Sequence, residues 1–259
     1  MTLAQYNEDE SGWKWLVLLG SFLNHIIICG VAFGAGVFQV IFMEVFEADG
    51  PRNMGRAGFL SIVTTLVSAM TFFVGPFTSA LINLFGCRMV AVCGCLLGSL
   101  GLILSSLANS EWTLLPAFGL IGIGLGIVYG PSIVIPCYYF EKKRPLATAV
   151  ASTGFGVGTF LFPLLVRFLV HEYSWRGSLL IIGAICLNML VSAALFRPIC
   201  LTQDLPSTSA VNDKASGGRL WLQLDELRQT SFLCVVLNNF LCLFGMVSYF
   251  IHLPVYSLN

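Results

Sequence analysis

The run Tyr139-Phe140-Glu141-Lys142-Lys143-Arg144 lies between two apolar stretches that are each long enough to cross a bilayer. Clusters of lysine and arginine beside membrane spans are retained on the cytoplasmic side, so the run indicates where this turn lies. The composition agrees, because 57% of the residues are hydrophobic and 10% are charged, whereas about a quarter of an ordinary soluble domain is charged. The sequence therefore predicts an integral membrane protein with this turn in the cytoplasm.

Seven apolar stretches are expected to cross the membrane as helices. A helix rises about 1.5 Å per residue and the hydrocarbon layer is about 30 Å thick, so about 20 apolar residues suffice. The stretches are residues 16–43, 57–75, 89–108, 113–139, 146–170, 179–196 and 232–254. The predicted fold is therefore all-α.

The chain is predicted to have four segments. They are a cytoplasmic tail (1–15), a six-helix transmembrane unit (16–196), a cytoplasmic linker (197–230) and the first helix of an incomplete second half (231–259). The linker contains Pro206, Gly217 and Gly218 among serine and threonine residues, a composition typical of flexible connections. Six helices, a long loop and the start of another apolar series are the layout of a transporter with two halves.

The distribution of positive charge predicts a cytoplasmic N-terminus. In this orientation the external loops carry Arg52, Arg56 and Arg176, and Arg167 remains inside a span. The cytoplasmic segments carry the larger set, which is Lys14, Arg88, Lys142, Lys143, Arg144, Arg197, Lys214, Arg219 and Arg228. An excess on the inner side is the pattern that orients proteins with several spans.

The charge balance and the cysteine pattern argue against several classes of function. Thirteen basic and thirteen acidic residues cancel, so no broad field favours nucleic acid as a partner. Most of the nine cysteines lie in apolar spans, and no pair of CxxC motifs is present, which favours packing over metal binding. No Ser-His-Asp set, paired acids or metal-spaced histidines indicate catalysis. We expect no enzyme activity, no metal and no cofactor.

Two segments carry recognisable motifs. The first is Glu10-Ser11-Gly12-Trp13-Lys14-Trp15, and the second comprises Tyr139, Phe140, Lys142, Lys143, Arg144, Leu146 and Ala147. Both resemble signatures of the monocarboxylate transporter family, a branch of the major facilitator superfamily, which read approximately D-G-G-W-G-W and Y-F-x-K-R-R-x-L-A-x-G. In the first motif Ser11 and Lys14 replace glycines, and in the second Ala149 occupies the small position.

Further positions support the resemblance. Arg88 ends the segment Asn83-Leu84-Phe85-Gly86-Cys87-Arg88, which resembles the superfamily's loop between helices two and three, with Leu84 where a basic residue is common. Gly154, like Gly156 and Gly158, lies inside a predicted span. Such glycines are expected to allow close helix packing rather than to bind phosphate.

The resemblance implies a secondary transporter of the plasma membrane, in which two six-helix halves rock about a site near the bilayer midplane. The implied substrate is a small organic acid or a related metabolite. The implied partners are the lipid bilayer and, as one option, an accessory membrane subunit. Phe33 stands where family members that carry small anions commonly have a lysine. The family's acid and arginine pair of helix eight would lie beyond Asn259.

Polar and aromatic residues inside the spans are the candidates for the substrate pathway: Asn24, His25, Phe33, Tyr129, Arg167, Asn238 and Asn239. His25 lies ten residues after Trp15, or about 15 Å along a helix, near the midplane. It either bonds to a neighbouring helix or binds a proton. Arg167 either reaches the outer headgroups or lines a vestibule for anions.

Two functions remain open from the sequence. One is transport by alternating access, as the resemblance implies. The other is a non-transporting, truncated membrane protein that associates with a full-length transporter or regulates it.

Overall fold

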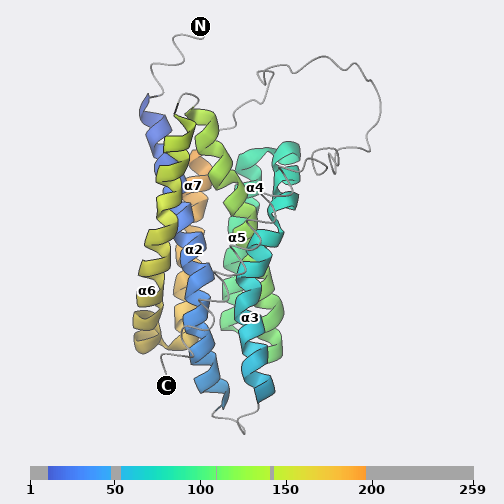
Figure 1. Ribbon diagram of the computed structural model, residues 1–259. Helices are drawn as coiled ribbons and strands as arrows, with labels where there is room; N and C mark the ends of the chain where they lie inside the picture. Colours follow the sequence, from blue (N-terminus) through green and yellow to red (C-terminus); the bar gives the residue numbers. More distant parts are fainter. Residues whose placement is uncertain (1–10, 48–53, 109, 141–142, 197–259) are drawn as a thin grey trace, which may run out of the picture. The chain divides into compact units, whose positions relative to one another are not determined.

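The computed structural model describes residues 11–47, 54–108, 110–140 and 143–196, and every element in these ranges is a helix (Figure 1). In chain order the helices are α2 (Ser11–Glu47), α3 (Met54–Phe73), α4 (Gly75–Ser106), α5 (Glu111–Tyr139), α6 (Arg144–Leu187) and α7 (Met189–Leu195). The chain divides into two units after Arg197, and all of these helices belong to the first. The predicted linker and seventh span lie outside the described residues.

Four helical stretches in the described part of the chain are long and apolar enough to cross a membrane. They are Gly12–Val45, Gly75–Ser106, Glu111–Tyr139 and Arg144–Leu195, while the apolar stretch Gly58–Phe73 is shorter. A helix suits this setting because it satisfies its own backbone donors and acceptors where no water is present. These helices confirm the prediction of an all-α membrane fold for the described residues.

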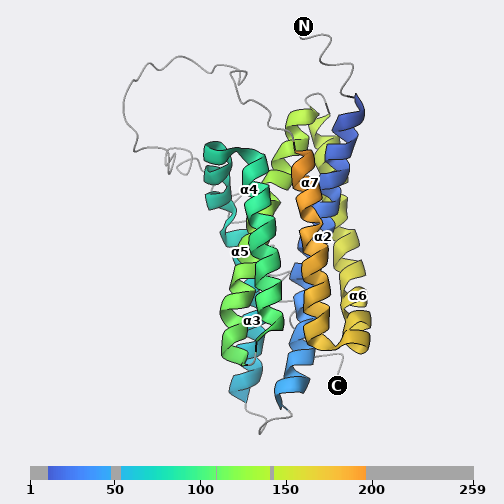
Figure 2. The same ribbon diagram turned by 180° about the vertical axis from the view of Figure 1, so that it is seen from behind.

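Two of the helices contain a sharp break. Gly86 of α4 has φ 79° and ψ 158°, and Ser174 of α6 has φ 63° and ψ 167°. Glycine adopts a positive φ without steric cost, which suits Gly86 to its position. Figures 1 and 2 show that α4 and α6 each contain two segments that run in opposite directions.

The segment before Gly86 differs from the sequence prediction, which ends a helix at residue 75 and places a loop before residue 89. Helical hydrogen bonds instead continue from α3 into α4, because the Val74 amide donates to Met70 O (3.1 Å) and the Thr78 amide donates to Val74 O (2.9 Å). Pro76 lies in the first turn of α4, where the missing N–H of a proline has little cost. The expected loop before Arg88 is therefore a tight break at Gly86.

Helix α5 packs against α4 through glycines. A Cβ atom added at Gly124 would lie 2.2 Å from the Gly98 amide nitrogen and 2.9 Å from Gly94 O. Only glycine permits such a close approach of two backbones. On another side of α5, a Cβ atom at Gly122 would lie 2.6 Å from Val67 O of α3. Helix α5 therefore contacts both neighbours backbone to backbone.

Helices α2 and α6 pack in the same way. A Cβ atom at Gly154 of α6 would lie 2.5 Å from Phe22 O, and one at Gly158 would lie 2.3 Å from Ile26 O. Two turns of α6 thus rest on two turns of α2, because positions four residues apart share one face of a helix. One turn further along, the ring of Phe162 fills the space above Gly30.

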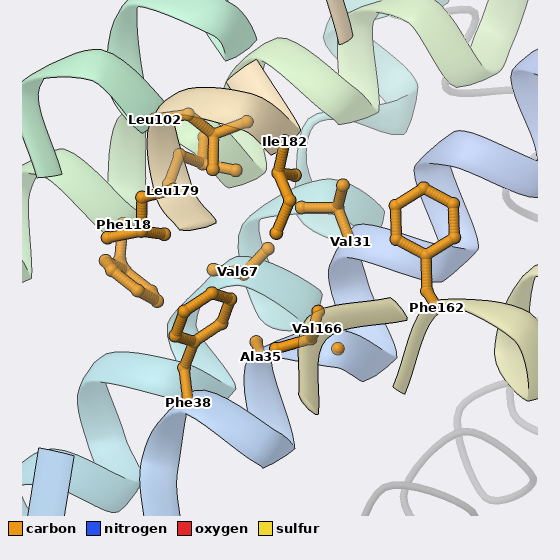
Figure 3. A pocket seen from close by; sticks show the side chains of 12 residues that line it. Val31, Ala35, Phe38, Val67, Leu102, Phe118, Phe162, Val166, Leu179 and Ile182 are labelled. Carbon is orange, nitrogen blue, oxygen red and sulfur yellow. The ribbon is translucent and has the colours of Figure 1, made fainter. Parts of the chain in front are cut away.

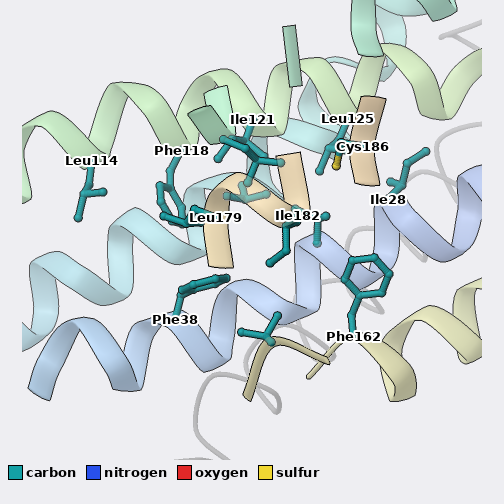
Figure 4. Close-up of a cluster of buried hydrophobic side chains, with 14 of the residues drawn as sticks. Ile28, Phe38, Leu114, Phe118, Ile121, Leu125, Phe162, Leu179, Ile182 and Cys186 are labelled. Atoms are coloured by element: carbon teal, nitrogen blue, oxygen red, sulfur yellow. The ribbon is translucent and has the colours of Figure 1, made fainter. Parts of the chain in front are cut away.

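The core between α2, α5 and α6 is apolar, and Figure 4 shows side chains of the three helices converging there. It contains a cavity of about 10 Å³ whose lining residues are all apolar, among them Val31, Phe118 and Ile182 (Figure 3). A bound water needs polar partners, and this cavity offers none from its lining side chains. It is a packing void rather than a binding site for a polar substrate.

The glycine contact predicts that Gly124→Ala destabilises the bundle by about 1–3 kcal/mol, because the added methyl overpacks two backbones. Gly156→Ala is the matched control, since a Cβ atom at Gly156 meets nothing within 4 Å. Both variants would be compared with the parent chain by thermal unfolding in the same detergent. An equal unfolding midpoint for the two variants would contradict the close contact of α4 and α5.

Candidate functional site

A buried hydrogen-bonded group joins α2 to α5 and is called the polar clasp below. It consists of Ser21 and Asn24 of α2 and Ser132 of α5, and all three residues are 0% exposed. The Ser21 hydroxyl donates to the Ser132 carbonyl, and Asn24 Nδ2 donates to Ser132 Oγ over 3.0 Å. Ser132 Oγ in turn donates to Val128 O over 2.9 Å. These bonds link α2 to α5 inside an apolar bundle through the two serine hydroxyls and the Asn24 amide nitrogen.

Pro136 explains why α2 must supply a donor at this point. In a regular helix the amide of residue 136 would donate to the carbonyl of Ser132, but proline has no N–H. Pro136 lies inside α5 and is buried. An unsatisfied carbonyl is costly where no water is present, and the Ser21 hydroxyl takes the place of the missing amide.

His25 lies beside the clasp and keeps one free ring nitrogen. Its Nδ1 is 2.8 Å from Ser21 O, and a carbonyl only accepts, so in the neutral imidazole Nδ1 carries the proton and Nε2 is an acceptor. Within the described part of the chain, His25 Nε2 and Asn24 Oδ1 are both buried without a hydrogen-bond partner. Gly154 of α6 packs closely on His25, because a Cβ atom there would be 3.1 Å from His25 Cβ.

Four half-buried aromatic residues from four helices form a continuous set, called the aromatic band below. Phe33 of α2 packs edge to face on Phe155 of α6, with ring centroids 6.4 Å apart. Tyr129 of α5 packs on Phe155 at 6.5 Å and on Phe72 of α3 at 6.2 Å. The ring of His25 reaches Tyr129 at 5.6 Å. The polar clasp and the aromatic band are therefore neighbours.

The two signature motifs meet at the end of the bundle where α5 ends and α6 begins. Trp15 packs edge to face on Phe140, with centroids 5.7 Å apart. Trp13 and Tyr139 both pack against one buried cluster, which consists of Val17, Ala91, Ile135, Ala193 and Phe196. Residues of both motifs thus join α2 to the connection between α5 and α6.

The remaining predicted residues do not join either group. Arg167, Arg88, Lys143 and Arg144 are exposed, and so is Gly12. Lys142, Asn238 and Asn239 lie outside the described residues. No group of three or more metal-ligating side chains occurs among the residues that the structure describes.

Sequence reasoning missed Ser21, Ser132, Phe72 and Phe155. Ser21 lies three residues before Asn24 and so shares its helix face, a spacing that could have indicated a polar face on α2. Ser132 precedes Pro136 by four residues, which marks a carbonyl in need of an outside donor. The two phenylalanines carry no such signal, because the chain has 21 of them.

Comparison with known proteins identifies the family. A family model described as the Major Facilitator Superfamily matches residues 22–259. The chain belongs to this superfamily. Monocarboxylate transporter 14 of Homo sapiens is 39% identical over 199 residues, which cover 76% of this chain and 38% of the human protein. Monocarboxylate transporter 6 of Mus musculus is 34% identical over 251 residues, which cover 92% of this chain and 52% of the mouse protein.

A third relative, monocarboxylate transporter 12 of Xenopus laevis, is 35% identical over 196 residues and is covered over 41% of its length. The chain thus spans about half the length of these relatives or less. The resemblance to the monocarboxylate transporter family that the two motifs predict is confirmed. The names of the relatives favour a transporter over an enzyme.

The clasp predicts an energetic coupling between Ser21 and Pro136. Ser21→Ala should destabilise the parent chain by about 1 kcal/mol, because it leaves the Ser132 carbonyl without a donor. In a Pro136→Ala background the same substitution should cost much less, since the new amide of residue 136 donates to that carbonyl. Unfolding free energies of the four proteins in one detergent would measure the coupling. Ser152→Ala, at an exposed position of α6, is the control and should show none.

Proposed function

We propose that this chain provides the N-terminal half of a secondary transporter that moves a small organic acid or a related metabolite by alternating access. The observation that carries the proposal is the polar clasp beside the aromatic band in a major facilitator chain. Buried polar groups are expensive inside a membrane and mark substrate pathways there. Names of relatives such as monocarboxylate transporter 14 agree with this class of substrate.

The proposal includes six membrane-crossing helices in residues 16–196 and a seventh in residues 231–259, after a cytoplasmic linker. The breaks at Gly86 and Ser174 support six crossings, because each separates two helical segments of opposite direction. The first crossing is α2, the second runs from α3 to Gly86, and the third follows Gly86. The fourth is α5, and the two parts of α6, the second continued by α7, form the fifth and sixth.

The depth of the candidate site supports a pathway near the middle of the bilayer. Tyr129 precedes the end of α5 at Tyr139 by ten residues, and Phe155 follows the start of α6 at Arg144 by eleven. Each distance is about 15 Å along a helix, or half of the hydrocarbon thickness of about 30 Å. A site at this depth can open to one side and then to the other when the two halves of a transporter rock.

The proposed orientation places the N-terminus, the turn before Arg144 and the linker in the cytoplasm of a cell whose plasma membrane holds the chain. The exposure of Lys143 and Arg144 supports it, because cytoplasmic turns retain positive charge. An epitope tag at the N-terminus should bind antibody only after permeabilisation. A tag inserted between residues 49 and 50 should bind antibody on intact cells, and the reverse pattern would overturn the orientation.

Transport itself is tested by uptake of labelled monocarboxylates, amino-acid derivatives and neutral metabolites into cells that express the 259-residue chain. Saturable uptake would mean that copies of this chain together enclose a site, and Phe33, which supplies no charge, predicts that such uptake does not follow an imposed pH gradient. Phe33→Lys should increase uptake of small carboxylates by adding the positive charge that the family commonly has there. Surface labelling would confirm equal expression of both proteins.

Absence of uptake by a chain that reaches the cell surface would contradict transport by these residues alone. Co-purification with a full-length relative or an accessory membrane subunit would then favour the second function, association without transport.

A further inference from the structure

The aromatic band lies at the edge of the core, where Tyr129 packs against the main buried cluster. Phe33, Phe72, Tyr129 and Phe155 are all partly exposed, and they come from α2, α3, α5 and α6. They pack edge to face in a chain with centroid separations between 6.2 and 6.5 Å. Because Phe72, Tyr129 and Phe155 are partly exposed, another ring can be added to them in the same edge-to-face geometry.

The helix segments around the band carry no charge. Residues 15–43 of α2, 57–73 of α3, 112–139 of α5 and 145–166 of α6 contain no Asp, Glu, Lys or Arg. A charged group of a ligand therefore finds no ion-pair partner on these segments. The available interactions are ring contacts and neutral hydrogen bonds, such as those that Tyr129 and His25 can make.

We propose that the substrate carries a planar aromatic ring, which packs on the aromatic band. The proposal rests on the proposed transport function and specifies the chemical class of its substrate. Phe33 strengthens it, because the position at which the resemblance implies a lysine holds a ring that contacts Phe155. The chain thus has a surface for a ring where it lacks a charge for a small anion.

The geometry favours an aromatic ring over a quaternary ammonium group. A cage for such a cation needs several ring faces turned toward one centre. Here the rings turn edges and faces toward one another, in pairs with interplanar angles of 68° for Phe33 and Phe155 and 72° for Tyr129 and Phe155. An added ring continues this arrangement, whereas a cation would have to break it.

The test is a binding measurement that needs no transport. The full chain in phosphatidylcholine nanodiscs would be dialysed against radiolabelled phenylacetamide or cyclohexylacetamide, two neutral amides of similar size. Empty nanodiscs would correct for partition into lipid. Ring contacts predict binding of the phenyl compound about 2- to 12-fold tighter than that of the cyclohexyl compound. Hydrophobicity alone predicts the opposite order, because the saturated ring is more apolar.

Variants test whether the preference for the phenyl compound arises at the aromatic band. Phe155→Leu and Tyr129→Leu should remove it, whereas Tyr129→Phe keeps the ring and should retain it. Phe160→Leu is the control, because Phe160 lies on the same helix as Phe155 but is 76% exposed and outside the band. Circular dichroism would verify that each protein is folded before binding is compared.

The outcomes separate this inference from the proposed function. Equal binding of the two amides, no binding of either, tighter binding of tetramethylammonium, or a preference that survives Phe155→Leu and Tyr129→Leu would overturn the inference. Uptake without ring preference would leave transport standing and remove only the aromatic substrate. Ring-selective binding that depends on Phe155 supports the inference. If the same chain shows no uptake, only the proposed transport function is contradicted.

Discussion

Gly124 of α5 approaches Gly98 of α4 so closely that a single methyl group on Gly124 would lie 2.2 Å from the Gly98 amide nitrogen. Lipid tails are as apolar as leucine, so helices in a membrane gain little from burying apolar side chains against each other and depend on close contact instead. The other side of α5 makes a similar contact to α3 at Gly122. Fixed on both sides, α5 carries Tyr129 and Ser132 one to two turns further along, and their positions follow from this packing.

Hydrogen bonds from side-chain hydroxyls to backbone carbonyls add directional contacts to that packing. The single hydroxyl proton of Thr71 has two acceptors within reach, Val67 O of its own helix (2.8 Å) and Gly122 O of α5 (3.2 Å). At Pro136 the need for a donor from another helix is stronger, because the proline removes the helical donor to the Ser132 carbonyl. The Ser21 hydroxyl of α2 replaces that donor. The proline that permits α5 to bend thus also requires α2 to lie beside α5, because α2 supplies the replacement donor.

The sequence predicted well what depends on local composition. Long apolar runs identified the helices, and the rarity of polar residues inside them drew attention to Asn24 and His25. The helix before Gly86 was predicted to end too early, because Pro76 resembles a break unless it is known to lie in a first turn. The partner of Ser21 lies 111 residues away, and Phe155 differs from the exposed Phe160 only in its contacts. Such pairings depend on tertiary packing, which no local pattern encodes.

Helices α2 and α5 are connected at two depths. Trp13 and Tyr139 pack on one buried cluster near the end of the bundle, and Ser21 bonds to Ser132 seven residues before Tyr139, or about 10 Å deeper. Two contacts at different depths resist both sliding and hinging of α2 against α5. A single contact would allow the two helices to rotate about it. We therefore expect any movement that exposes the candidate site to leave this pair together. The contacts of the motif residues at the end of the bundle then help to hold the polar clasp in register.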